Sequence, residues 1–263
     1  MRVLVIGGSG HVGSLVLPYL AEHHDLAVFD LKPPIAGVEV EYLPGDLRDV
    51  AAVRRSFDGI DALVFMAMGP LSGWGSPENA QAHLDVAVPG LYAALAAAHD
   101  AGVDHAVYTS SMSVFALRHD GHADADAHGT EERQPVGTND GAPARLPRYP
   151  DESTPPDATD FYGLAKRLGE EVCRNAVAAW GMSVVALRLC HPTADAEFPR
   201  TESPIRQTIC TSARDTAAAI LAGLEYRGHG FEAFGISGDA AGRTVSIRKA
   251  GEVLGWQPLD RTT

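Results

Sequence analysis

The sequence has few cysteines, and they are far apart. Cys173, Cys190 and Cys210 are its three cysteines in 263 residues, and no two of them form a CxxC pair. An odd number of widely spaced cysteines is typical of reduced thiols rather than of a disulfide framework. We therefore expect a cytoplasmic protein, and a chain of this length can bury a full core without disulfides or metals.

Basic residues are also scarce. Lysine and arginine together number 21 against 34 aspartates and glutamates, which gives a formal net charge of −13 with the histidines neutral. A surface of this sign repels polyphosphate, so we expect no nucleic-acid partner. Long apolar runs are missing too, because no window of about 18 consecutive apolar residues offers a membrane span. The first residues lack the basic region of an export signal, and we expect no membrane partner.

What the sequence does contain is an alternation of strand-like and helix-like segments. Short apolar, β-branched runs suit parallel strands buried on both faces, and they occur at residues 2–6, 26–30, 38–43, 61–66, 104–109 and 182–189. Helix-like segments lie between them, at residues 11–22, 79–101 and 161–180, and Pro89 and Gly90 interrupt the second of these. Strands that alternate with helices predict an α/β fold with a doubly wound parallel sheet.

A glycine-rich loop follows the first strand. Gly7, Gly10 and Gly13 form a GxxGxxG pattern that opens the first helix. Glycine permits the tight turn and lets the backbone approach a pyrophosphate, which the N–H groups of the helix N-terminus then bind. An ordinary glycine-rich turn is the alternative, but the strand–loop–helix context favours a dinucleotide site in a Rossmann-type fold. We assign residues 1–190 to this dinucleotide-binding domain and residues 191–263 to a small C-terminal substrate-binding appendage.

Acidic residues follow the next two strands. Asp30 ends the second strand, 20 residues after Gly10. A carboxylate at that position accepts hydrogen bonds from the adenosine ribose and repels a 2′-phosphate, which predicts NAD in preference to NADP. A turn or helix cap is the alternative role for Asp30. Asp46, in the Gly-Asp-Leu triplet after the third strand, either reaches the adenine or forms a turn.

Tyr162 and Lys166 form a YxxxK pattern within a predicted helix. Residues four apart share a helix face, and an ammonium group lowers the pKa of a nearby phenol towards a value useful for proton transfer. The alternative is a surface pair on an amphipathic helix. Ser110, Ser111 and Ser113 lie at the end of the fifth strand, where parallel strands line the ligand crevice. One of these serines could hold a substrate oxygen as its charge changes.

Residues 116–157 break the alternation of strands and helices. The segment is rich in proline, aspartate, histidine and glycine. It lacks periodicity, as is typical of an inserted lid, a binding loop or disorder. His119, His122 and His128 lie among aspartates and could suggest a metal site. A closed metal site needs ordered partners around its ligands, so we expect a solvated acidic loop and no metal.

Together these residues form an ordered set of motifs along nearly the whole chain, which reads GGSGHVG at 7–13, Asp30, GDL at 45–47, VYTSSMSV at 107–114, YGLAK at 162–166, LRLCHPT at 187–193 and GWQP at 255–258. The set resembles the short-chain dehydrogenase/reductase superfamily, in its extended epimerase/dehydratase branch. The resemblance implies that Ser111, Tyr162 and Lys166 are catalytic. Tyr162 would be the acid/base, while Lys166 would bind the nicotinamide ribose and tune Tyr162. The cofactor contacts that it implies are Gly7, Ser9, Gly10, His11, Val12, Gly13, Asp30, Leu31, Asp46, Leu47, Met66, Ala67, Tyr162, Lys166 and His191.

Two positions depart from the pattern of this branch. Ala87 stands where an asparagine usually lies, three residues before Gly90, and His191 replaces an asparagine after the sixth strand. His191 either packs on the cofactor side or contacts nicotinamide or substrate.

Within the branch, the chain is most similar to the uronate dehydrogenases. Arg206 lies nine residues before Asp215, as does an arginine that holds the sugar carboxylate in that group. An arginine fork matches a carboxylate, although a surface helix residue is the alternative role for Arg206. The resemblance also implies substrate contacts at Ser72 and at Ser113, the latter in place of a histidine, besides those of Ser111, Tyr162 and His191.

The predicted function is therefore NAD-dependent oxidation of a small polar alcohol, either a sugar or a uronic acid. A sugar-nucleotide epimerase or dehydratase is the first alternative, but the segment after the sixth strand is short for enclosing a nucleoside diphosphate. A non-catalytic dinucleotide-sensing regulator is the second alternative, against which the intact Tyr162 and Lys166 argue. By resemblance, we also expect a homodimer formed through the helices near residues 85–101 and 160–179.

Overall fold

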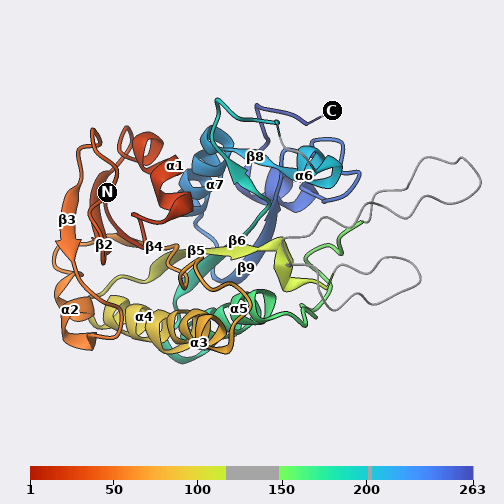
Figure 1. Cartoon of the computed structure of the whole chain (residues 1–263). Coiled ribbons are helices and arrows are strands. Elements are labelled where there is room, and N and C mark those ends of the chain that lie inside the picture. Colours follow the sequence, from red (N-terminus) through yellow and green to blue (C-terminus); the bar gives the residue numbers. More distant parts are fainter. Residues whose placement is uncertain (117–147, 201–202, 263) are drawn as a thin grey trace, which may run out of the picture.

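The computed structural model describes residues 1–116, 148–200 and 203–262. Its centre is one parallel sheet in the order β3-β2-β1-β4-β5-β6-β9 (Figure 1). The strands of this sheet are β1 (Arg2–Ile6), β2 (Asp25–Asp30), β3 (Glu41–Pro44), β4 (Ala62–Phe65), β5 (His105–Ser111), β6 (Ser183–Leu189) and β9 (Gly230–Ile236). The strand order reverses between β1 and β4, which is where open α/β sheets bind ligands at the carboxyl ends of their strands. The predicted Rossmann-type doubly wound sheet is confirmed.

Helices cover both faces of the sheet, as Figure 1 shows. They are α1 (His11–Leu20), α2 (Val50–Arg55), α3 (Pro77–Asp85), α4 (Leu91–Asp100), α5 (Phe161–Trp180), α6 (Pro204–Ile209) and α7 (Ala213–Glu225). The short elements are β7 (Pro192–Thr193), β8 (Thr211–Ser212), η1 (Val86–Gly90), η2 (Met112–Val114) and η3 (Ala250–Leu254). Side chains of α1 and α7 pack on one face of the sheet, and those of α2, α4 and α5 pack on the other. Each face therefore has its own apolar core.

The helix predicted for residues 79–101 is divided into three segments. α3 ends at Asp85, the π-helical turn η1 follows, and α4 begins at Leu91. Pro89 lies inside η1. Proline lacks the N–H of a regular helix and its ring crowds the carbonyl four residues earlier, so the turn widens by one residue.

The segment after residue 190 contributes the strand β9 to the main sheet. β9 pairs along its whole length with β6, from Gly230 beside Ser183 to Ile236 beside Leu189. The buried Asp215 of α7 then holds the end of the chain, because its carboxylate accepts from the N–H groups of Leu259 (3.0 Å) and Asp260 (2.8 Å). The appendage and the dinucleotide-binding half therefore share one sheet.

None of the helices in the described segments combines the length and the apolar character needed to cross a bilayer. Of the predicted insertion, residues 117–147 lie outside the described residues, and so do its three histidines. The stretch from Arg148 onwards is joined to the fold by Glu152, whose carboxylate accepts from the N–H of Gly235 at 2.8 Å.

Candidate active site

The glycine loop connects β1 to α1 and is held by its own backbone. Gly7 has a φ of +85°, a conformation that L side chains rarely adopt. Its N–H donates to the carbonyl of Phe29 on β2 (3.0 Å), and the N–H of Gly10 donates back to Gly7 (3.1 Å). At Gly13 a Cβ would lie 2.0 Å from the carbonyl oxygen of Gly8. The loop and the first turn of α1 thus pack backbone to backbone, which forms the cradle that a pyrophosphate requires.

Asp30 lies beside this loop at the end of β2. Its carboxylate accepts from the N–H of Ser9 (3.0 Å) and from the N–H of Lys32 (3.2 Å), and the Ser9 hydroxyl donates to the carbonyl of Lys32 (2.7 Å). The side chain is half-buried. Two backbone N–H groups orient the carboxylate, and its remaining lone pairs are available to ribose hydroxyls. This arrangement fits the dinucleotide that the sequence predicts.

Other predicted cofactor residues lie on elements next to the glycine loop. Met66 and Ala67 directly follow β4, and Ala67 lies so close to Gly7 that a Cβ there would be 2.4 Å from its backbone. His11 begins α1, where its Nε2 lies 3.3 Å from the carbonyl of Pro192. Val12 follows it and is half-buried, whereas Leu31 is exposed.

Asp46 forms a turn. Its carboxylate accepts from the backbone N–H of Arg48 (2.9 Å) and from the Arg48 guanidinium, which holds the pKa of that carboxyl below its usual value. Leu47 packs near Gly90 of η1. The structure thus supports the turn-forming role of Asp46 directly, and a contact with the adenine stays a prediction.

The predicted catalytic residues come together from β5 and α5. Ser111 is the last residue of β5, while Tyr162 and Lys166 lie one turn apart at the start of α5. The Lys166 ammonium is buried, donates to the carbonyl of Thr109 (2.7 Å) and lies 5.9 Å from the centre of the Tyr162 ring. Asp160 caps α5 by accepting from the N–H of Gly163 (2.9 Å), which fixes where the helix begins.

Burial shifts the pKa values of both titratable groups in this cluster. It raises the pKa of the Tyr162 phenol, and a hydrogen bond with Ser111 opposes that shift. Burial also lowers the pKa of Lys166 to about 8, which still leaves the ammonium charged at neutral pH. A phenol bonded to a serine hydroxyl near a buried cation has the chemistry required to exchange a proton with an alcohol.

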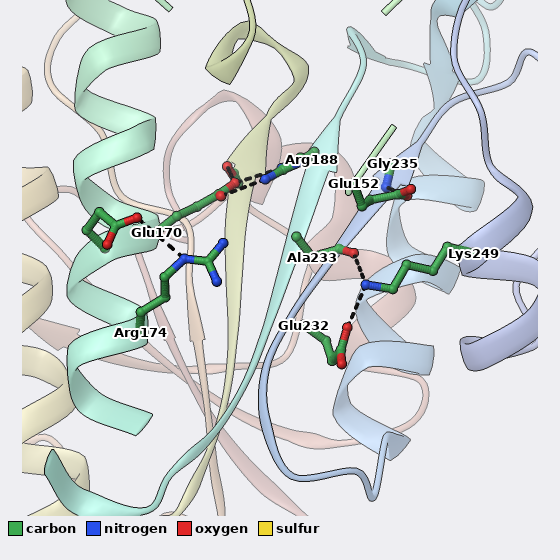
Figure 2. A network of polar contacts seen from close by, with 10 residues as sticks. Glu152, Glu170, Arg174, Arg188, Glu232, Ala233, Gly235 and Lys249 are labelled. Atoms are coloured by element: carbon green, nitrogen blue, oxygen red, sulfur yellow. Dashed lines mark hydrogen bonds and ion pairs between the residues drawn. The ribbon is translucent and has the colours of Figure 1, made fainter. Parts of the chain in front are cut away.

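The neighbouring Ser110 has a different partner. Its hydroxyl donates to the buried Glu170 of α5 at 2.7 Å. Glu170 also accepts two hydrogen bonds of 2.9 Å from Arg188 of β6, and both charged side chains are 1% exposed. Figure 2 shows this pair between helix and strand, apart from the more exposed contact of Lys249 with Glu232. Ser110 thus bonds Glu170, whereas Ser111 bonds Tyr162.

The predicted substrate residues are more scattered. The N–H of Ser113 donates to the Ser111 hydroxyl (3.1 Å), so these two serines lie together. His191 follows β6 with a φ of +37°, which is uncommon for a residue other than glycine and is concentrated at functional sites. Ser72 is exposed in the loop after β4, and Arg206 is exposed on the short helix α6. The roles of all four in substrate binding stay predictions.

Sequence reasoning missed an aromatic cluster beside Tyr162. The Trp74 ring lies 5.4 Å from that of Tyr162, 4.9 Å from that of Phe161 and 5.3 Å from that of His83. The buried Glu170–Arg188 pair was missed as well. A signal for that pair existed, because an arginine inside an otherwise apolar strand needs a buried partner. Within the described residues, no three histidine, cysteine, aspartate or glutamate side chains gather as metal ligands would.

Comparison with known proteins adds to this geometry. The model of the NAD dependent epimerase/dehydratase family matches residues 3–211. NAD-dependent glucose-6-phosphate dehydrogenase of Haloferax volcanii is 28% identical over 269 residues, which cover 99% of this chain and 94% of that protein. Uronate dehydrogenase of Pseudomonas putida is 28% identical over 268 residues, covering 98% and 84%. A protein of Sinorhizobium fredii, the uncharacterized y4nG, is 30% identical over 188 residues, and there the match spans 70% of this chain but 39% of the relative.

Solved structures share the fold. Uronate dehydrogenase from Agrobacterium tumefaciens superimposes with a TM-score of 0.72 at 24% identity, over 99% of this chain and 85% of that one. UDP-glucose 4-epimerase from Brucella ovis, in complex with NAD, gives 0.72 at 19% identity, over 98% and 93%. The glycine cradle, Asp30 and the family match agree on the cofactor, which is NAD. The chain therefore belongs to the NAD-dependent epimerase/dehydratase family, and it is an enzyme of that family.

Proposed function

We propose that the protein is a dehydrogenase that oxidises a small polar alcohol, either a sugar or a uronic acid. The observation that carries this proposal is the cluster of Ser111, Tyr162 and Lys166 at the carboxyl end of β5, with the Ser111 hydroxyl bonded to Tyr162 and the Lys166 ammonium buried nearby. The likeness to a glucose-6-phosphate dehydrogenase and a uronate dehydrogenase over nearly the whole chain supports the substrate class.

The residues have separate roles in this reaction. Bound NAD supplies the acceptor for the hydride that leaves the carbinol carbon. Ser111 orients the substrate hydroxyl, and Tyr162 as phenolate accepts its proton. Lys166 favours that phenolate through its charge. The glycine loop and Asp30 hold the dinucleotide, while Arg206 would hold a substrate carboxylate, if the substrate has one, through its guanidinium fork.

A spectrophotometric assay tests this proposal. We expect NADH to appear at ~340 nm, the usual nicotinamide absorbance, with at least one member of a panel of sugars, uronic acids and related alcohols. Tyr162→Phe should abolish turnover and leave the affinity for NAD unchanged, because it removes the proton acceptor and little else. Tyr226→Phe removes a phenol hydroxyl at the end of α7 and serves as the control. Unchanged turnover in Tyr162→Phe would reject the mechanism.

An epimerase or dehydratase is the second candidate, because UDP-glucose 4-epimerase of Lactobacillus helveticus is 28% identical over 72% of this chain. Such an enzyme recycles its NAD. NAD that co-purifies with the protein and is never released as NADH would favour it over the dehydrogenase.

The homodimer also stays a prediction. A groove of about 400 Å³ is lined by residues of α2, η1, α4 and α5, where Tyr92 is 48% exposed. Its lining is mostly apolar and comprises Val50, Arg54, Val88, Pro89, Tyr92, Ala93, Ala96 and Val172. A second copy packed there would use the helices that the resemblance implies.

A further inference from the structure

The loop of residues 69–76 between β4 and α3, here called the Trp74 loop, is fixed by side chains of the following helix. The Asn79 amide donates to the carbonyls of Pro70 (2.6 Å) and Ser72 (3.0 Å). The His83 Nε2–H donates to the same Pro70 carbonyl (3.3 Å). Asn79 and His83 are 4% and 3% exposed, so these bonds are shielded from water. These buried hydrogen bonds therefore fix the path of the loop.

The start of the loop lies tightly against α3. At Gly69 a Cβ would lie 2.5 Å from the His83 ring. The carbonyl bonds and this close approach leave the backbone of residues 69–72 little freedom. Ser76 then caps α3 by accepting from the N–H of Asn79 (3.1 Å), which fixes the other end of the loop.

Trp74 is the residue that this loop presents to the catalytic tyrosine. Its indole ring contacts the rings of Tyr162, Phe161 and His83 at centroid distances of 4.9–5.4 Å. The three contacts are tilted or edge-on, as aromatic pairs prefer. Trp74 is half-buried rather than enclosed. An indole that touches the Tyr162 ring and is still partly exposed lies at the edge of the place where the substrate must bind.

The substrate geometry follows from Tyr162. A hydroxyl that gives its proton to the phenol oxygen must approach to about 3 Å. The rest of a sugar-sized molecule then extends over the surroundings of Tyr162, which include the Trp74 indole. The face of an indole carries negative charge density and attracts the slightly positive C–H groups of a saturated ring. The hydroxyls of that ring point outwards from its rim, away from the indole.

We propose that Trp74 is a specificity-determining residue, forming a wall of the substrate site that selects a cyclic substrate with an apolar C–H face over an open-chain alcohol. This inference rests on the proposed dehydrogenase function and names the shape of its substrate. His83 supports the wall as a neutral ring, because burial and the charge of Lys166 both lower its pKa.

The test compares Trp74→Ala, Trp74→Phe and, as a control on the same loop, Leu71→Ala, whose side chain is 64% exposed. For each variant, kcat and KM are measured with a cyclic sugar or uronic acid and with an open-chain polyol. The affinity for NADH and the melting temperature are measured alongside. An aromatic contact corresponds to about a two- to tenfold change in binding.

We expect Trp74→Ala to raise KM for the cyclic substrate about fivefold or more, with a smaller change for the polyol and none in NADH affinity. Trp74→Phe should retain most of the preference, and Leu71→Ala all of it. If Trp74→Ala does not fold, Trp74→Leu keeps the bulk without the aromatic face and serves in its place. If Trp74→Ala leaves the ratio of kcat/KM for the cyclic substrate to kcat/KM for the polyol unchanged, and lowers only kcat or the melting temperature, the wall is overturned. The dehydrogenase proposal would remain intact.

Calorimetric titration of the NADH complex with the same sugars separates the two proposals. Binding of cyclic sugars without any turnover would reject the dehydrogenase function, and the loss of that binding in Trp74→Ala would still support the wall. A wild-type protein that neither binds nor oxidises any cyclic sugar contradicts both.

Discussion

The glycine loop and the Trp74 loop both connect a strand of the parallel sheet to the helix that follows, but they are held in different ways. In the glycine loop, Gly7, Gly10 and Gly13 bond or touch other backbone atoms. In the Trp74 loop, the side chains of Asn79 and His83 bond the carbonyls and aromatic rings fill the space. A backbone cradle suits a constant ligand such as a pyrophosphate. The side chains that hold a loop can differ between enzymes, so a loop of this kind suits a substrate that differs between enzymes.

The largest effect should come from breaking the backbone cradle. In Gly13→Ala the new methyl group would lie 2.0 Å from the Gly8 carbonyl oxygen, and backbone cannot move aside cheaply. We expect a loss of about 1–3 kcal/mol in the free energy of unfolding and a fall of about tenfold or more in NAD affinity. Urea unfolding and NADH fluorescence titration measure the two effects. Gly251→Ala is the matched control, since a methyl group there would lie at an ordinary 3.7 Å from the carbonyl oxygen of Trp256.

A smaller and more selective effect should follow from loosening the side-chain-held loop. Asn79→Ala removes the donor to Pro70 and Ser72, at a cost of about 1–2 kcal/mol in stability. We expect KM for the substrate to rise several-fold, about the effect of 1 kcal/mol, while NADH affinity stays constant. Glu78→Ala is the control variant, because Glu78 is exposed on the same turn of α3. A parallel fall in NADH affinity would show that the two loops are not independent.

The smallest effect should be a pH dependence of stability that comes in part from His83, the α3 residue that bonds the Trp74 loop. Burial lowers the pKa of His83 in the folded protein. On acidification, its imidazole is therefore protonated near pH 6.5 in the unfolded chain but only at a lower pH in the folded chain. Stability should therefore fall as the pH drops below about 6.5, until the lower folded pKa is reached. His83→Gln should reduce the slope of stability against pH in this range. A variant with the wild-type slope would exclude His83 as the source.

The same contrast explains what the sequence could predict. Gly7, Gly10, Gly13 and Asp30 were predictable because a dinucleotide imposes one backbone geometry, and that geometry needs glycine and a carboxylate at fixed spacings. Tyr162 and Lys166 were expected on one helix face from their spacing, and the glycine loop upstream favoured a joint role for them over a surface pair.

The substrate side was harder to predict for physical reasons. The contacts of Trp74, Asn79 and His83 depend on the path of the loop. No spacing of residues in the sequence predicts such contacts. Pro89 signalled an interruption of the helix, yet proline can end, kink or widen a helix, and the sequence does not say which. The seventh strand of the sheet, residues 230–236, was not located because Gly230, Glu232 and Gly235 interrupt its apolar run.

The buried Glu170–Arg188 pair bears on how this enzyme could be redesigned. A shift of α5 by one helical turn, about 5.4 Å, would separate these charged side chains, which are 1% exposed, and each uncompensated charge would cost several kcal/mol. The helix that carries Tyr162 thus has a single allowed registration against β6. A changed substrate preference would then come from reshaping the loops around a stationary Tyr162, so new substrates would have to be brought to the proposed proton acceptor, which cannot be moved to meet them.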